Sequence, residues 1–265
     1  MKQLCFALLA IACLALVTSC FEKKENVKEN TFTVGFDADF PPYGFKDSAT
    51  GEYTGFDLEL AAEVCARNGW QLVKKPINWD AKDMELNSGA IDCIWNGFTI
   101  NGREKDYTWT EPYVDNSQVV LVKANSSIKT LADLAGKVVA VQTDTPVQKA
   151  LKEDGDKAAL GKTFKKLLTT PTYNNAVMEL EAGAVDAVAM DIGVAQKKLA
   201  DTKDAFRMLD EKIMTEKYGI GFKLGNTGLR DKVQATLKAM VKDGKAAEIS
   251  GKWFKGENII ILPAE

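Results

Sequence analysis

Two side chains of this sequence suit the opposite poles of a zwitterion, and both stand near the ends of β-prone runs. Arg103 offers a planar guanidinium, which can hold a carboxylate through two parallel hydrogen bonds. Asp191 follows the run 185–190 and can pair with an ammonium group. Each also has an ordinary alternative, as a solvated surface arginine or a helix-capping aspartate. Together they predict a site for the backbone of an α-amino acid.

Further hydrogen-bonding groups stand at the ends of other β-prone runs. Asp37 follows the run 31–36, and Gln142 ends the run 137–142. Thr145 is a plausible helix N-cap, and Pro146 suits the first helical position. Free backbone amides at such a helix end attract an anion, although simple capping also explains the pattern.

The segment 37–45 and the segment 96–103 complete the set of candidates. Two prolines fix the first segment as a loop, and Phe40 is its best candidate for an aromatic ligand wall. In the second segment Gly97 allows a ligand to approach the backbone closely, and Thr99 offers a hydroxyl group.

The elements that must position these residues occur twice along the chain. Residues 84–93 (MELNSGAIDC) return as residues 178–187 (MELEAGAVDA). In each copy a helix ends at glycine and a β-prone run follows, at 91–95 and 185–190. Upstream strands are expected at 31–36 and 137–142, and an amphipathic helix at 56–68. The order β-α-β-α-β in each half predicts two α/β lobes, with ligands beyond the carboxyl ends of the strands.

The composition excludes several classes of function. The net charge is −3 with no basic stripe, which argues against nucleic acid as a partner. The chain has no histidine, the commonest zinc ligand and general base. We therefore expect no metal, no cofactor and no catalytic residue. A composition of 46% apolar and 27% charged residues is typical of a globular protein.

The N-terminal residues have the pattern of a targeting signal. Residues 4–17 are apolar or small, too few to span a bilayer and typical of a signal peptide over residues 1–19. They lead to Val17-Thr18-Ser19-Cys20, which resembles a lipobox; an ordinary secretory signal is the alternative. Cys20 would then be lipidated and residues 20–30 would form a solvated tether. Cys65 and Cys93 remain, as a disulfide or as buried thiols.

Four stretches give the chain a family resemblance: residues 34–43 (VGFDADFPPY), 55–61 (GFDLELA), 136–142 (GKVVAVQ) and 218–222 (YGIGF). The chain resembles the family 3 extracellular solute-binding proteins, the amino-acid receptors of ABC importers, over about residues 31–258. The resemblance implies a periplasmic-binding-protein-like (type II) fold with two α/β lobes joined by two hinge strands. Lobe 1 would comprise residues 31–119 and 222–265, and lobe 2 residues 120–221. Ligand binding would close the lobes by a hinge motion.

The resemblance also implies roles for ten residues of one ligand site. Phe40 and Trp79 would stack on the two faces of the ligand, and Arg103 would hold the carboxylate. Asp191 would hold the ammonium group. The remaining polar contacts would come from Asp37, Asn96, Gly97, Thr99, Gln142 and Thr145.

The expected function is therefore the capture of a free amino acid and its delivery to an ABC permease. Asp37 and Gln142 favour a ligand with a polar or cationic side chain. The protein would be a monomer, outside the cytoplasm and held at the bacterial cell membrane by its lipid. Two alternatives use the same scaffold: a cyclohexadienyl dehydratase-like lyase, or a sensor that signals to a membrane partner.

Overall fold

A computed structural model describes residues 30–152 and 155–265. The predicted signal segment, the lipidation residue Cys20 and the tether up to residue 29 lie outside these described residues. Residues 32–265 form one compact unit, and the description that follows concerns this unit.

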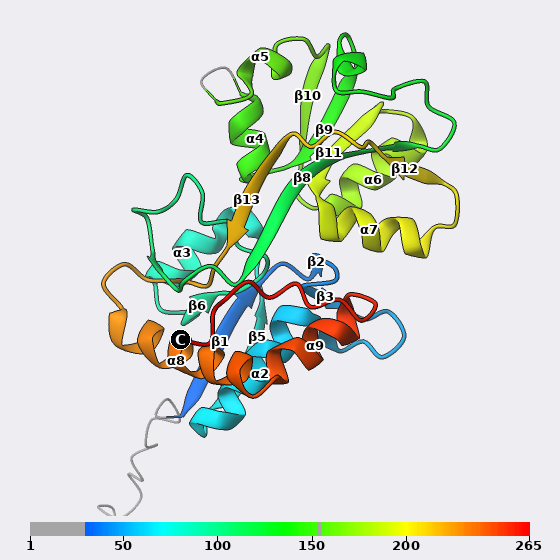
Figure 1. The fold of residues 1–265 in the computed structure, drawn as a ribbon. Coiled ribbons are helices and arrows are strands. Elements are labelled where there is room, and N and C mark those ends of the chain that lie inside the picture. Colours follow the sequence, from blue (N-terminus) through cyan, green and yellow to red (C-terminus); the bar gives the residue numbers. More distant parts are fainter. Residues whose placement is uncertain (1–29, 153–154) are drawn as a thin grey trace, which may run out of the picture. The chain divides into compact units, whose positions relative to one another are not determined.

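A five-stranded sheet combines strands from the first part of the described chain with β14 from its later part (Figure 1). Its strand order is β5-β1-β6-β14-β7. Strands β1 and β6 are parallel, and β14 pairs antiparallel with β6 and β7. The strands are β1 (Thr31–Phe36), β5 (Gln71–Pro76), β6 (Cys93–Ile94), β7 (Thr108–Trp109) and β14 (Gly221–Phe222).

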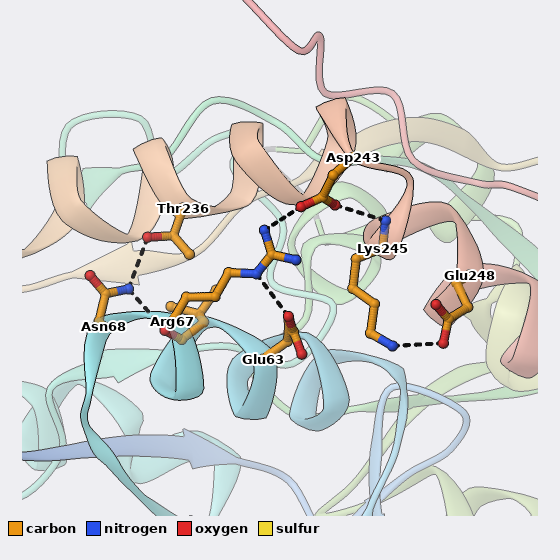
Figure 2. Close-up of polar contacts among 8 residues, drawn as sticks. Glu63, Arg67, Asn68, Thr236, Asp243, Lys245 and Glu248 are labelled. Atoms are coloured by element: carbon orange, nitrogen blue, oxygen red, sulfur yellow. Dashed lines mark hydrogen bonds and ion pairs between the residues drawn. The ribbon is translucent and has the colours of Figure 1, made fainter.

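Three helices pack together beside this sheet: α2 (Phe56–Asn68), α8 (Thr227–Lys242) and α9 (Lys245–Trp253). Helix α2 buries Phe56, Leu60 and Val64 on one face, as its amphipathic pattern predicts. Figure 2 shows polar contacts at the C-terminal end of α2: Asn68 donates to the Thr236 hydroxyl of α8, and Arg67 pairs with Asp243 directly after α8. The C-terminal helices are thereby fixed to a helix from the beginning of the chain.

A six-stranded sheet is built from the middle of the chain, with β10-β9-β11-β8-β12 as its order and β13 paired with β8. Strands β9, β10 and β11 are parallel, whereas β8 runs antiparallel to β11, β12 and β13. The strands are β8 (Val114–Lys123), β9 (Val138–Gln142), β10 (Lys166–Thr170), β11 (Ala187–Asp191), β12 (Phe206–Met208) and β13 (Met214–Tyr218). Its helices are α4 (Pro146–Leu151), α5 (Ala158–Gly161), α6 (Tyr173–Ala182) and α7 (Ile192–Asp201).

Short elements lie between the strands of both sheets. A small antiparallel sheet follows β1 and consists of β2 (Asp39–Phe40), β3 (Gly44–Lys46) and β4 (Tyr53–Thr54). A 3-10 turn η1 (Trp79–Ala81) leads into α3 (Lys82–Asn87), and a second turn η2 (Ala132–Leu134) precedes β9.

Two strands carry the chain from one sheet to the other. Strand β8 follows β7 of the five-stranded sheet, and β13 leads back to β14 of that sheet. The two are paired antiparallel from Val114↔Tyr218 to Gln118↔Met214. This double connection is the pair of joining strands that the sequence resemblance implies, and Figure 1 shows both strands running side by side.

Most of the elements expected from the sequence are present. The strand 31–36 and the helix 56–68 have the expected bounds, and the run 137–142 forms β9. In the second copy of the repeat, Gly183 caps α6 in the left-handed conformation, with φ 79°. The run 91–95 is shorter than expected, because only Cys93–Ile94 forms regular strand. Cys65 and Cys93 are both buried free thiols.

Within residues 30–152 and 155–265 no helix has both the length and the apolar character needed to cross a membrane.

Candidate functional site

Nine of the ten positions expected to form the site line one small cavity between the two sheets. The cavity volume is about 10 Å³, close to the minimum that a single water molecule needs. It lies beyond the carboxyl ends of β6, β9 and β11, where open α/β sheets bind ligands. Its lining consists of Phe40, Trp79, Asn96, Gly97, Thr99, Arg103, Gln142, Thr145, Pro146 and Asp191.

Arg103 reaches from the five-stranded side of the cavity to the six-stranded side. Its Nη2 atom donates to the backbone carbonyl of Asp144 at 2.6 Å. The guanidinium carbon lies 5.2 Å from the centre of the Phe98 ring, and the side chain is 14% exposed. Its Nη1 atom donates to the Thr99 carbonyl at 3.5 Å. The aromatic ring holds the guanidinium at the cavity edge, where the N–H groups that these two carbonyls do not use can bind a carboxylate.

Asp191 is buried at the end of β11 and accepts hydrogen bonds from four side chains. Asn116 and Gln118 on β8 donate to Oδ1 at 2.7 and 2.9 Å, and the Tyr218 hydroxyl donates to the same oxygen. The Tyr173 hydroxyl donates to Oδ2 at 2.8 Å. Burial raises the pKa of Asp191, and these four donors oppose that rise. Asp191 stands at the N-cap position of α7, but its side chain makes no capping bond.

A second buried acid, Glu216 on β13, shares two of these donors. Asn116 and Gln118 each donate to Oε1 of Glu216 at 2.7 Å while also donating to Asp191. Burial and the charge of Asp191 raise the pKa of Glu216. Two amides from one joining strand therefore hold two carboxyl groups together beside the cavity.

Asp37 does not line the small cavity but lies beside it, bonded to a residue that does. Its Oδ2 atom accepts a hydrogen bond of 2.6 Å from Gln142, which belongs to the other sheet. Its backbone amide donates to Asn96 Oδ1 at 2.8 Å. Burial raises the pKa of Asp37 to about 6, and the hydrogen bonds from Asp39 and Gln142 limit the rise. Asp37 thus links the two sides of the site.

The aromatic side chains of the site pack at its edges. The Phe40 ring is buried against Tyr43 and Tyr173, with ring centres 5.6 and 5.8 Å apart. The Trp79 ring meets Phe98 edge to face at 5.4 Å. Both rings line the cavity, as expected of the two stacking aromatics.

Gly97 is required where the backbone approaches Phe40. Its φ is 54°, in the left-handed region, and a Cβ atom there would lie 2.8 Å from Cε1 of Phe40. The Gly97 amide donates to the buried carboxylate of Asp57 at 2.6 Å. Neighbouring Thr99 is buried and pairs with Tyr218 through a backbone bridge, so this segment is attached to β13.

Thr145 caps helix α4 as predicted. Its hydroxyl accepts from the Gln148 amide at 3.3 Å and donates to the Gln142 carbonyl at 2.8 Å. Pro146 occupies the first helical position and lines the cavity, where it offers no N–H group. The helix has six residues, and capping accounts for the observed bonds at its start.

Two larger pockets of opposite character adjoin the small cavity. One, of about 520 Å³, shares Trp79 with the cavity, and Asp37, Asp39, Asp80 and Glu85 are the charged residues of its lining. The other, of about 630 Å³, shares Arg103, Thr145 and Pro146 with the cavity. Six of its lining residues are basic: Lys82, Arg103, Lys105, Lys149, Lys152 and Lys223. The cavity therefore has an acidic pocket on one side and a mainly basic pocket on the other.

Some residues of the site were not anticipated from the sequence. The ammonium group of Lys82 pairs with the Asp144 carboxylate across the two sides. Glu216 was also missed. It lies with Tyr218 on the buried face of β13, while Thr215 and Lys217 between them are exposed. A charged residue on an otherwise buried face is a signal that the sequence did contain. Among the described residues, no cluster of three or more acidic or cysteine side chains gathers as metal ligands would.

Comparison with known proteins identifies the family. The model of the bacterial extracellular solute-binding proteins, family 3, matches residues 32–256. The chain belongs to this family. Among its relatives is the L-cystine-binding protein TcyJ of Escherichia coli (strain K12), 30% identical over an alignment of 259 residues that covers 94% of this chain and 94% of that protein.

Solved structures of the family share the fold. A substrate-binding protein of an ABC uptake transporter from Streptococcus pneumoniae, with bound histidine, superposes with a TM-score of 0.81 at 30% identity, covering 88% of this chain and 95% of the other. An ancestral arginine-binding protein bound to glutamine gives 0.78 at 35% identity, covering 86% and 99%. The fold is thus the type II periplasmic-binding-protein fold expected from the sequence. Proteins of this family act outside the cytoplasm, as its description states.

Proposed function

We propose that this protein binds a free amino acid between its two sheets and delivers it to an ABC permease. The observation that carries the proposal is that Arg103 and Asp191 line one cavity. A guanidinium for the carboxylate and a carboxylate for the ammonium group fit the two charges common to all free amino acids. Relatives named as amino-acid-binding proteins of ABC transporters support the assignment.

We propose that lobe 1, residues 31–119 and 222–265, and lobe 2, residues 120–221, separate to admit the ligand. A cavity of about 10 Å³ is too small for an amino acid, so side chains or lobes must move before binding. The bonds Gln142–Asp37 and Asn174–Asp39 join the two sides, at 2.6 and 2.9 Å. Closure about β8 and β13 remakes these bonds around the ligand.

The preferred ligand is an amino acid with a cationic side chain. With its carboxylate at Arg103, on the basic side, a bound amino acid can extend its side chain past Trp79 into the acidic pocket. The lining of that pocket contains four acids and no lysine or arginine. A cation there gains attraction from Asp37, Asp39 and Asp80, whereas an anion would be repelled. The relatives and neighbours named above are described with cystine, histidine, arginine and glutamine, which supports an amino acid without fixing the side chain.

Calorimetry with the purified protein tests the proposal. The panel is the twenty amino acids together with ornithine and cystine. We expect arginine, lysine or ornithine to bind most tightly, and Arg103→Ala to weaken binding by about tenfold or more, which corresponds to about 1.4 kcal/mol. Arg67→Ala is the matched control, because Arg67 pairs with Glu63 and Asp243 on the helices shown in Figure 2. Preference for leucine or valine, or normal binding by Arg103→Ala, would contradict the proposed site.

The role is binding and not catalysis. Asp191 accepts four hydrogen bonds, which stabilise its ionised form, so it suits an ion pair with an ammonium group better than the removal of a substrate proton. Incubation with a prephenate-like substrate checks this statement, and turnover would refute it.

The protein is proposed to be a monomeric lipoprotein with its lipid on Cys20. The support is the stretch Val17-Thr18-Ser19-Cys20 after an apolar run of signal-peptide length. Intact-mass measurement of the membrane fraction should find a cleaved, acylated chain, and Cys20→Ser should release the protein into the soluble fraction. A wild-type chain without acyl mass would exclude the anchor. Sedimentation of the soluble variant measures its oligomeric state.

A further inference from the structure

The buried pair Asp191 and Glu216 has more negative charge than its surroundings neutralise. Both carboxyl groups accept from the same two amide nitrogens, those of Asn116 and Gln118, at 2.7 to 2.9 Å. Asp191 is 4% exposed and Glu216 3% exposed. Neither has an ion pair with a lysine or arginine within the described parts of the chain. Two ionised carboxylates this close and this dry repel each other strongly.

The hydrogen bonds are distributed unequally between the two acids. Asp191 uses both oxygens and accepts from Asn116, Gln118, Tyr173 and Tyr218. Glu216 uses Oε1 alone, and its buried Oε2 atom has no hydrogen-bond partner among the described residues. Donors stabilise the ionised form, so Asp191 retains its charge and Glu216 is the better place for a proton.

We propose that Glu216 is a positioning residue: it shares one proton with Asp191 in the ligand-free protein and releases that proton to solvent when a ligand's ammonium group contacts Asp191. The inference rests on the proposed function, because it requires an ammonium group at Asp191. The arriving positive charge replaces the proton in offsetting the second carboxylate. The two carboxyl groups together with their proton, or with the ammonium group that replaces it, carry the same net charge before and after binding, and no oxidant or other reactant takes part.

The other titratable and charged groups around the pair do not replace this role. Tyr43, Tyr173 and Tyr218 face the pair, and burial raises the pKa of each hydroxyl well above its ordinary value. Asp57 acts on the same Tyr43 from α2, and burial raises the pKa of Asp57 to about 7. Arg103 lines the cavity but donates to Asp144.

Thr99 faces Glu216 with a hydroxyl that favours its ionised form. The burial and the repulsion from Asp191 together raise the pKa of Glu216 to about 7.

Carbon-13 NMR of the glutamate carboxyl groups tests the ligand-free state. We expect one glutamate resonance to titrate near neutral pH, to be absent from Glu216→Gln, and to move toward the ordinary range in Asp191→Asn. If a variant folds poorly, the titration of the wild-type protein alone still tests the inference. A wild-type protein in which every glutamate titrates in the ordinary range overturns the inference.

Calorimetry in two buffers with different ionisation enthalpies tests the release, at about pH 6.5 with arginine as the probe. We expect the wild type to release a substantial fraction of a proton on binding, and Glu216→Gln to bind with most of that release lost. Asp57→Asn removes another nearby buried acid with a raised pKa and should still release it. Asp37→Asn should lose only the smaller share that Asp37, with a pKa of about 6, contributes with a cationic probe. Undiminished release by Glu216→Gln overturns the inference. If the wild type binds no amino acid, the proposed function fails, while the NMR titration still decides whether the proton is shared.

Discussion

The ammonium group of Lys82 and the carboxylate of Asp144 form an ion pair that connects the start of α3 to the loop after β9. The Lys82 side chain is 2% exposed, whereas that of Asp144 is 46% exposed. Asp144 also adopts a left-handed conformation with φ 57°, which aspartate tolerates better than most residues. The buried member of the pair therefore depends on a partner that water can reach.

Replacing Asp144 by asparagine should destabilise the protein because it leaves the Lys82 charge buried and poorly paired. We expect the free energy of unfolding to fall by about 1–3 kcal/mol, reduced from the value for a fully buried pair by solvent at Asp144. Lys82→Met in the same chain should recover most of the loss. Urea unfolding measures all three proteins.

The control for this pair is Asp115→Asn, which removes the partner of Lys217 from an exposed ion pair with side chains 52% and 63% exposed. Its effect should stay within about 0.5 kcal/mol. Equal losses for Asp144→Asn and Asp115→Asn would mean that burial of Lys82 does not matter.

The stability of the protein should fall as pH rises from about 4 to about 7. Burial raises the pKa of Asp57 from 3.8 to about 7, so between these values the folded state binds more protons than the unfolded state. Asp37, Asp191 and Glu216 shift in the same direction. The stabilisation from the protonated groups is complete below the unfolded pKa and is lost as pH rises through the folded pKa. Urea unfolding at about pH 4.5, 6 and 7.5 measures it.

Asp57→Asn should flatten this pH dependence, although it also removes an acceptor from the Gly97 amide or the Tyr113 hydroxyl. Asp133→Asn is the control, because hydrogen bonds from the Lys129 and Thr130 amides lower the pKa of exposed Asp133 and keep its titration below this range. A wild-type stability that rises with pH over the same interval would contradict the raised pKa values.

Gly97→Ala should weaken both folding and ligand binding. An alanine there has a left-handed backbone and a Cβ atom 2.8 Å from the Phe40 ring. Gly89→Ala is a matched control, since Gly89 has φ 76° but a Cβ atom there would meet nothing within 4 Å beyond its own chain neighbours. The shared backbone strain is about 1–2 kcal/mol, and the clash at Gly97 adds about 1–3 kcal/mol. Unfolding and calorimetry on both variants separate the two effects. Equal behaviour would show that Phe40 moves aside freely.

Asp37→Asn should alter the preference among ligands. Loss of the carboxylate should weaken arginine or lysine binding by about tenfold or more, since a charge-assisted hydrogen bond contributes about 1.5–3 kcal/mol, and should affect glutamine less. Because the pKa of Asp37 is about 6, wild-type affinity for a cationic ligand should fall as pH drops through that value. Asp80→Asn, at an exposed position of the same pocket, should weaken binding of the cationic ligand much less, because solvent screens its charge. Parallel losses for cationic and neutral ligands would argue against a charge contact.

Local patterns in the sequence predicted the elements well where one face is buried. Helix α2 has the expected bounds because its apolar face begins at Phe56 and Gly69 caps its end with φ 69°. The run 91–95 was overestimated, although its amides still bond to β1: Asp92 donates to Thr33 at 2.8 Å and Trp95 to Gly35 at 3.2 Å. Residues 91–95 are therefore extended, but only Cys93 and Ile94 pair regularly with strands on both sides.

The ligand site was predicted mainly by the rule that groups after strand ends meet, together with the family resemblance. That rule has no information about contacts between distant segments. Lys82 and Asp144 are 62 residues apart and no local pattern joins them. Glu216 is 98 residues from Gln118 and 25 from Asp191, so its role appears only when β8, β11 and β13 are assembled.

The connection between the sheets also affects the order in which the molecule can be built. Residues 114–218 contain every strand of the six-stranded sheet, so that half can complete its hydrogen bonding from one continuous stretch as the chain emerges. The other sheet must wait, because its strand β14 sits between β6 and β7 but comes after the whole inserted stretch. Helices α8 and α9 follow later still and cover α2. The edge of β6 therefore stays open to wrong partners until the last part of the chain arrives, and a chaperone has most to protect in that interval.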